Sequence, residues 1–210
     1  MTAAPPRFIF PARPINGGPL DKARPKHGTW IYEPKLNGWR TVIHAPTRTM
    51  WNRHGALLSI AREFADALDA LAALSAASGI EYFDCEGLER RHSLGHGALY
   101  ILDFIPHGVS PRGPKPIATT GLATWLHRST VLDEFLGRMR FDVLPVRGSL
   151  NRPDLLPGTL ESWQAIQQIN RHWSAEFYEG LVAKRTDSPY PRATSATQET
   201  PHWMKHRWAF

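Results

Sequence analysis

The segment that most constrains the fold is residues 98–105, ALYILDFI, in which Asp103 is the one charged residue of an otherwise largely apolar run. A strand at the surface of a sheet alternates apolar and polar residues, whereas a strand that is covered on both faces is apolar nearly throughout. The pattern therefore predicts a buried strand in the centre of a sheet.

The rest of the chain shows short β-like runs and amphipathic helices in alternating groups. Apolar residues recur at three- and four-residue steps from Ile60 to Leu74, which predicts a helix with Ser59 as its N-cap and Gly79 just past its end. Further helices are expected at 122–139 and, with Thr159 as N-cap, at 160–169. Further strands are expected at 28–32, 39–45, 49–53, 81–88, 141–146, 178–185 and 202–208, and a loop at 187–200. Since strands outnumber helices, we predict an α+β fold of antiparallel or mixed β-sheets flanked by helices.

The N-terminal segment differs from the rest in composition and charge. Residues 1–27 are rich in Pro and Gly, and we expect an irregular basic arm there, followed by one domain over 28–210. Residues 1–40 hold seven Lys or Arg and two Asp or Glu, which is +5 of the net +6 of the chain. A basic segment attracts polyanions, most commonly nucleic acid, but it also occurs as a solvated tail. Charge alone leaves both interpretations open.

Several classes of protein are excluded by composition. The single cysteine, Cys85, rules out an intrachain disulfide and a multi-cysteine zinc site. No apolar run approaches the ~20 residues of a membrane helix, so no membrane partner is expected. Prolines and arginines interrupt the first residues, MTAAPPRFIFPARP, where a signal peptide needs an apolar stretch. We therefore expect a cytoplasmic protein.

Lys35 is the strongest candidate for a reactive residue, in the run Glu33-Pro-Lys-Leu-Asn-Gly-Trp-Arg40. It lies between an expected strand and Gly38, which allows a ligand to approach the main chain closely. A lysine becomes a nucleophile where burial or nearby cations favour its neutral form. A lone Lys-x-x-Gly is nevertheless more often a surface lysine at a turn.

Three other segments supply the groups that chemistry on a nucleoside triphosphate requires. Asp84 and Glu86 lie two residues apart, hence on one face of a strand, and suit Mg²⁺ or a ribose hydroxyl. The motif Glu179-Gly-Leu-Val-Ala-Lys184 has a carboxylate at one end and a lysine at the other, and Trp203-Met-Lys205-His-Arg207 has two cations on one face. Such cations would neutralise phosphates. Each motif alone is weak, but together they indicate a lysine nucleophile, metal-binding carboxylates and phosphate-binding cations.

In this order, these motifs resemble the covalent nucleotidyltransferases, and most of all the ATP-dependent DNA ligases. The family signature K-x-D-G-x-R is matched by Lys35 to Arg40, with Asn37 in the place of Asp. The other matches are Asn52-Arg53-His-Gly55, Phe83-Asp84-Cys-Glu86-Gly87, Leu99-Tyr100-Ile-Leu102-Asp103, E-G-L-V-x-K at Glu179–Lys184 and W-x-K-x-K at Trp203–Arg207, with Arg as the last residue. The match spans about residues 28–208, so the resemblance implies a ligase adenylation domain over this region.

The resemblance implies a reaction and a role for each matched residue. Lys35 would attack the α-phosphate of ATP and form a lysyl-AMP, from which AMP would pass to a 5′-phosphate at a nick in double-stranded DNA. Such an enzyme serves DNA repair or replication and uses Mg²⁺ or Mn²⁺. The implied contacts are Glu33 with adenine, Arg40 and Arg53 with ribose or phosphate, Glu86 with ribose or metal, Glu179 with metal, Lys184 and Lys205 with the α-phosphate, Arg53 and Arg207 with DNA, and Tyr100 as the nearest aromatic platform for adenine.

Two departures from the family pattern keep alternatives open. Asn37 keeps a hydrogen-bond acceptor but loses a charge. Ligases usually continue into an oligonucleotide-binding barrel, and we expect no such domain within residues 1–210. We therefore expect either that self-adenylation is slow or that a separate oligonucleotide-binding (OB-fold) protein supplies the barrel. An RNA ligase shares the lysine chemistry, and a non-catalytic module that binds nicked nucleic acid or a partner ligase is the alternative from a different class.

Overall fold

The strand expected at residues 98–105 is β7 (Ala98–Phe104) in the computed structural model, which describes residues 6–20, 25, 27–88, 95–106, 124–138 and 147–207. Leu99 and Ile101 belong to one buried apolar cluster, whereas Tyr100 and Leu102 belong to or pack against another. Both faces of β7 are therefore covered, and the prediction of a buried central strand is confirmed.

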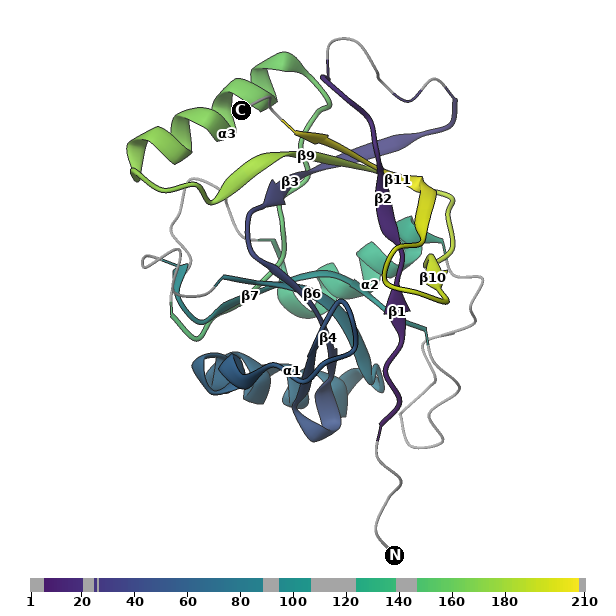
Figure 1. Ribbon diagram of the computed structural model, residues 1–210, viewed down its shortest axis with the longest axis vertical. Helices are drawn as coiled ribbons and strands as arrows, with labels where there is room; N and C mark the ends of the chain where they lie inside the picture. The colour runs from purple at the N-terminus through teal and green to yellow at the C-terminus, as the bar shows by residue number, and fades with distance from the viewer. Residues whose placement is uncertain are drawn as a thin grey trace, which may run out of the picture.

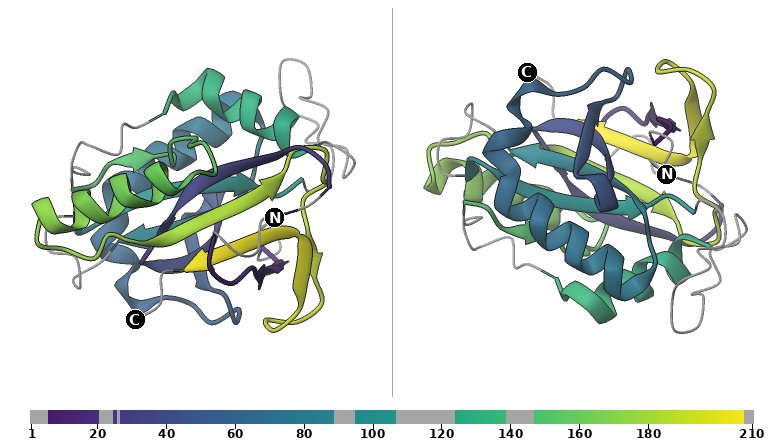
Figure 2. Two further views of the ribbon diagram at one scale, coloured as in Figure 1. Left: turned by 90° about the horizontal axis from the view of Figure 1, so that it is seen from above. Right: turned by 90° about the horizontal axis from the view of Figure 1, so that it is seen from below.

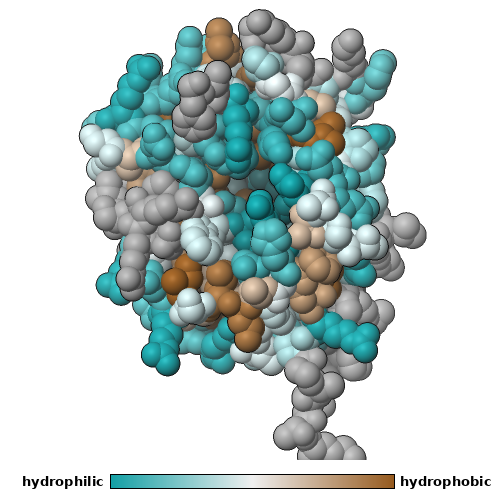
Figure 3. Space-filling view, viewed as in Figure 1, coloured by the Kyte–Doolittle hydropathy of each residue, from teal (hydrophilic) through white to brown (hydrophobic). Residues whose placement is uncertain are grey.

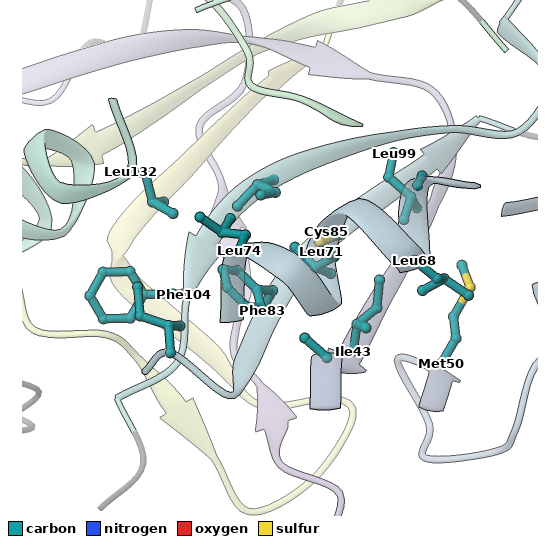
Figure 4. Close-up of a cluster of buried hydrophobic side chains, with 14 of the residues drawn as sticks. Ile43, Met50, Leu68, Leu71, Leu74, Phe83, Cys85, Leu99, Phe104 and Leu132 are labelled. Atoms are coloured by element: carbon teal, nitrogen blue, oxygen red, sulfur yellow. The ribbon is translucent and has the colours of Figure 1, made fainter. Parts of the chain in front are cut away.

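The first cluster lies between a five-stranded sheet and two helices. The sheet has the order β5 (Thr49–Asn52), β4 (Trp39–His44), β6 (Tyr82–Leu88), β7, β8 (Leu150–Asn151), and its strand pairs are antiparallel except β7 with β8. The helices are α1 (Ala65–Ser78) and α2 (Trp125–Leu136). Leu71 and Leu74 of α1 pack on Phe83 and Leu99 of the sheet in this cluster (Figure 4).

A second sheet lies against the other face of the first (Figures 1 and 2). It has the order β2 (Arg13–Asn16), β11 (Glu199–Arg207), β9 (Tyr178–Arg185), β3 (Trp30–Leu36), in which β2 is parallel to β11 and the other pairs are antiparallel. Helix α3 (Leu160–His172) packs along β9, and a small pair, β1 (Phe10–Pro11) and β10 (Arg192–Ala193), lies beside β11. Mixed sheets flanked by helices confirm the α+β prediction.

The structure corrects two expectations about local structure. The segment 1–27 is not irregular throughout, because β1 and β2 form there by pairing with strands about 180 residues away in the chain. Local Pro and Gly content cannot reveal such partners. Ser59 is not the N-cap of α1, because Ser59–Phe64 is a 3₁₀ helix that delivers the fully buried Phe64 into the core, and α1 begins only at Ala65.

Other expectations are confirmed in full or in part, or lie outside the described residues. The loop expected at 187–200 contains β10 and the first two residues of β11, which form by pairing with the N-terminal strands β1 and β2. Thr159 caps α3 by accepting a hydrogen bond from the backbone N–H of Ser162, as predicted. The second helix is shorter than expected and is capped by Thr124. The strand expected at 141–146 lies outside the described residues. Among the described helices, none has the length and apolar character needed to cross a membrane.

Candidate active site

A cavity of about 470 Å³ opens between the two sheets, and nine of the ten residues to which the ligase resemblance assigns a role line it. Figure 3 shows a hollow, surrounded by hydrophilic side chains, near the centre of this face. The nine residues are Glu33, Lys35, Arg40, Arg53, Glu86, Glu179, Lys184, Lys205 and Arg207. Residues from five strands and from the turn after β5 thus converge on one site.

Strand register explains why residues so far apart in sequence meet. Lys35 and Arg207 both lie opposite Gly180 of β9, and Glu33 and Lys205 both lie opposite Val182. Residues two apart on a strand share a face, so β3 and β11 present their functional side chains in two rows, one on each side of β9. The two-residue spacing of Glu33 and Lys35, and of Lys205 and Arg207, in the sequence is therefore the spacing of side chains along one face of a strand.

Lys35 forms an ion pair with Glu179 through its Nζ. The same carboxylate oxygen, Oε1 of Glu179, also accepts a hydrogen bond of 3.0 Å from Arg207. Lys35 and Glu179 are both mostly buried. The amine of Lys35 therefore has a carboxylate in direct contact that can take up a proton.

Lys184 forms a second ion pair deeper in the cavity, with Glu33 at 2.7 Å, and both residues are only 2% exposed. Lys184 also donates to the backbone carbonyl of Leu102 at 2.8 Å. The other carboxylate oxygen of Glu33, Oε1, is buried and has no hydrogen-bond partner within the part of the chain that the structure describes. A buried acceptor of this kind is costly unless a bound ligand donates to it.

Arg40 contacts protein groups through all three of its guanidinium nitrogens. Nε and Nη2 donate to Asp84 at 2.9 and 2.7 Å, and Nη1 donates to the carbonyl of Ala12 at 2.8 Å. Asp84, which is fully buried, also accepts from the Tyr190 hydroxyl at 2.8 Å. Arg40 thus joins β4 to β6 and to the N-terminal segment, a role that sequence reasoning missed because Tyr190 and Ala12 are distant in the chain.

Glu86 lines the cavity and accepts a hydrogen bond of 3.0 Å from the backbone N–H of Gly38. Burial raises the pKa of Glu86 from 4.5 to about 7, against the opposing effect of Lys35 and Arg40. Gly38 comes so close to β6 that a Cβ there would lie 2.5 Å from the carbonyl oxygen of Gly87. Only glycine allows this approach, which fixes the turn between Lys35 and Arg40 against the Glu86 strand.

The outer part of the cavity is basic. Burial lowers the pKa of Lys205, and the neighbouring Arg13 lowers it further. Arg53 contacts its neighbour His54, and Arg13 is a lining residue that sequence reasoning did not select because it lies in the expected arm. Trp203 also lines the cavity, with its ring 5.2 Å from the guanidinium carbon of Arg40 and 5.1 Å from Nζ of Lys184.

Of the ten residues to which the resemblance assigns a role, Tyr100 alone is not among the lining residues. It is buried in the core cluster with Leu36 and Tyr178, so the expectation of an adenine platform there is corrected. Leu102, two residues further along β7, lines the cavity instead, together with Val182. On β7 and β9, the apolar surface on which an adenine ring could lie is therefore formed by aliphatic side chains.

The carboxylates of the site suit a metal ion that arrives with phosphate groups. No cluster of three or more His, Cys, Asp or Glu side chains that could hold a metal is found among the described residues. Glu86 and Glu179 both line the cavity. Because Mg²⁺ is usually held by one or two carboxylates together with substrate phosphates and water, these two residues fit such an ion.

The solved structures that match this chain share one fold. No family model matches the sequence, and no curated protein matches it either. The ligase domain of M. tuberculosis LigD matches with a TM-score of 0.60 and 17% identity, over 95% of this chain and 59% of that one. This is a DNA ligase fold.

Two further ligases match in the same way. A Lig E DNA ligase matches with a TM-score of 0.54 and 11% identity, over 96% of this chain and 70% of that one. The Chlorella virus DNA ligase-adenylate matches with a TM-score of 0.51 and 11% identity, over 94% and 69%. The chain spans about three fifths of the length of the LigD ligase domain and shares its α+β arrangement.

Proposed function

We propose that this chain is an ATP-dependent polynucleotide ligase that works through a lysyl-AMP intermediate and acts on nicked double-stranded DNA. The observation that carries the proposal is the convergence of Lys35, Glu179, Lys184 and Lys205 on one cavity, from three adjacent strands. The likeness of the fold to DNA ligases supports it.

In the first step, Nζ of Lys35 attacks the α-phosphorus of ATP. A P–N bond forms, the bond to the oxygen that bridges to the β-phosphate breaks, and pyrophosphate leaves with that electron pair. Glu179, which contacts Nζ, is the group that takes up the proton of Lys35. Lys184 and Lys205 stabilise the negative charge that develops on the phosphate oxygens.

In the later steps, a 5′-phosphate oxygen at the nick attacks the phosphorus of the lysyl-AMP and breaks its P–N bond, so that Lys35 is released. The neighbouring 3′-hydroxyl then attacks the 5′-phosphorus, a phosphodiester forms and AMP leaves. The basic outer part of the cavity, with Arg53 and Arg207, suits the DNA backbone. A Mg²⁺ or Mn²⁺ ion held by Glu86 and Glu179 would neutralise charge on the phosphates.

Glu33 favours adenine over guanine. Its unpartnered Oε1 is a buried acceptor on the cavity wall. The exocyclic amino group of adenine can donate to such an oxygen, whereas guanine carries a carbonyl oxygen at the equivalent ring position and would repel it. ATP is therefore the proposed nucleotide.

The test is intact-mass measurement after mixing the chain with ATP and Mg²⁺. The expected result is a mass increase of one AMP, absent in Lys35→Ala and absent with GTP. Sealing of a nicked DNA duplex against a nicked RNA duplex then identifies the strand type. If the wild-type chain forms no adduct and seals no nick, with or without a pre-adenylated strand, the proposal is wrong.

Asn37, which replaces the usual Asp, favours a second candidate, a non-catalytic module that binds nicked nucleic acid or a partner ligase. In the structure its Nδ2 donates to the backbone carbonyl of Glu176 at 3.1 Å. An Asp has no N–H to make this bond, so Asn37 has a structural use of its own. Two results together would favour the non-catalytic module: no AMP adduct on the wild-type chain, and binding to nicked nucleic acid that is unchanged in Lys35→Ala.

A further inference from the structure

Three cations that line the cavity have no carboxylate partner in the part of the chain that the structure describes. Four others are paired: Lys35 and Arg207 with Glu179, Arg40 with Asp84, and Lys184 with Glu33. The three without such a partner are Arg13, Arg53 and Lys205. Unpaired cations that share one cavity repel one another, which a bound polyanion relieves.

Arg13 differs from the other two because it lies outside every motif of the ligase resemblance. Like the side chain of Lys205, that of Arg13 has neither a hydrogen bond nor an ion pair with any described residue, whereas Arg53 contacts His54. Arg13 is the first residue of β2 and lies opposite Glu199 of β11. Arg13 and Lys205, which lies further along β11, both line the cavity. The positive charge of Arg13 adds to burial in lowering the pKa of Lys205.

The backbone on either side of Arg13 is firmly held. Arg13 itself donates its N–H to the carbonyl of Gln198 at 2.9 Å, and Ala12 donates to Pro191 at 3.0 Å. The carbonyl of Ala12 in turn accepts from Arg40 at 2.8 Å. The strand β2 lies beside β11 in the second sheet (Figure 1). The guanidinium of Arg13 is thus presented from a strand that is held by this sheet and, through the carbonyl of Ala12, by Arg40.

We propose that Arg13 is a further phosphate-binding residue of this site, contributed by the N-terminal strand and acting with Lys205 on one phosphate group. A guanidinium presents several donors in a planar fork that matches phosphate oxygens. The inference rests on the proposed function, because the phosphate belongs either to ATP or to the 5′ end of the nicked strand. Both sources present the same phosphate group to Arg13. The experiment distinguishes them by which reaction step slows when Arg13 is replaced.

The experiment compares Arg13→Ala and Arg13→Lys with the wild type, and uses Arg192→Ala as the control. Arg192 is an exposed arginine of the neighbouring strand β10, and it does not line the cavity. Two rates are measured: formation of the lysyl-AMP over a range of ATP concentrations, and sealing of a pre-adenylated nicked duplex without ATP. Thermal unfolding of each variant shows whether the fold is kept.

Loss of a charge-assisted contact to phosphate lowers the rate or affinity by about 10- to 100-fold. A loss of this size for Arg13→Ala in the first reaction assigns the contact to ATP, and in the second reaction to the strand phosphate. Arg13→Lys restores part of the loss, and Arg192→Ala stays within about twofold of the wild type. Equal rates for Arg13→Ala and Arg192→Ala in both reactions would overturn the inference.

A calorimetric titration with inorganic pyrophosphate keeps this test independent of catalysis. An inactive wild type would disprove the proposed function but not the inference about Arg13. If that inference holds, Arg13→Ala binds pyrophosphate about tenfold more weakly than Arg192→Ala, whether or not the chain is active. Equal binding by the two variants, or no binding to the wild type, would count against Arg13.

Discussion

Glu33 of β3 and Lys184 of β9 form an ion pair of 2.7 Å that is almost completely enclosed by protein. Two charges removed from water stabilise a fold only while both are present. The rings of Trp203 and Trp125 and the carbonyl of Leu102 also contact Lys184, so the pair is held within the wall of the proposed nucleotide site.

Removing one charge of this pair should therefore lower the free energy of unfolding substantially. We expect Glu33→Gln to lower the free energy of unfolding by about 3–5 kcal/mol, since Lys184 is then left buried without a counter-ion. The double variant Glu33→Gln, Lys184→Met should recover part of that loss. Urea denaturation of the three proteins measures both effects, and a single-variant cost below about 1 kcal/mol would contradict the burial of the pair.

Glu86 predicts an unusual dependence of stability on pH. Its pKa rises from 4.5 to about 7 in the folded chain, so between these values the folded state keeps a proton that the unfolded state has lost. The contribution of Glu86 to the free energy of unfolding is therefore greatest below pH 4.5. It falls as pH rises and levels off above about pH 7.

Glu86→Gln removes this titration. We expect the variant to gain stability relative to the wild type, by up to about 3 kcal/mol, as pH rises through this window. Denaturant unfolding at a series of pH values measures the difference. A difference that does not change with pH would mean that the carboxyl group of Glu86 titrates normally.

The contact between Gly38 and β6 leaves no room for a side chain. Gly38→Ala would place a Cβ 2.5 Å from the backbone oxygen of Gly87, so we expect a loss of about 1–3 kcal/mol and weaker formation of the lysyl-AMP. Gly137→Ala is the comparison, because that site has a φ of 64° but no atom within 4 Å of the added Cβ. It should cost about 1 kcal/mol from backbone strain and leave adduct formation intact. Similar adduct yields from both variants would show that the turn tolerates movement.

The Arg40–Asp84–Tyr190 contacts predict a graded series of stability losses. Asp84→Asn leaves the Arg40 guanidinium without its carboxylate, and we expect a loss of about 3–5 kcal/mol. Tyr190→Phe removes one hydrogen bond to a charged acceptor and should cost about 1.5–3 kcal/mol. Thermal or urea unfolding ranks the two variants, and the reverse order would disprove the central role given to Asp84.

The sequence predicted those features that depend on residues close together in the chain. The apolar run of β7, the N-cap Thr159 and the i, i+2 spacing of Lys205 and Arg207 are local patterns, and all three have the expected structural result. The α+β class follows from the same patterns.

The features that the sequence did not predict depend on partners that are remote in the chain. Tyr100 and Leu102 share a face of β7, and only the packing of Tyr178 and Leu36 decides that Tyr100 is enclosed in the core. Asp84 was paired with Glu86 as a metal or ribose ligand, yet the register of β4 and β6 and the position of Tyr190 commit it to Arg40. Strand formation at Arg13 required knowledge of β11.

The parallel pairing of β2 with β11 also sets an order of events during folding. Closing a loop of about 180 residues has a high entropic cost, so this pairing forms late compared with local hairpins such as β4–β5. A ribosome-bound chain that has not yet extruded β11 lacks both Lys205 and the strand on which Arg13 rests. The surroundings that Arg13, Lys205 and Arg207 provide for Lys35 can therefore form only after β11 has been synthesised.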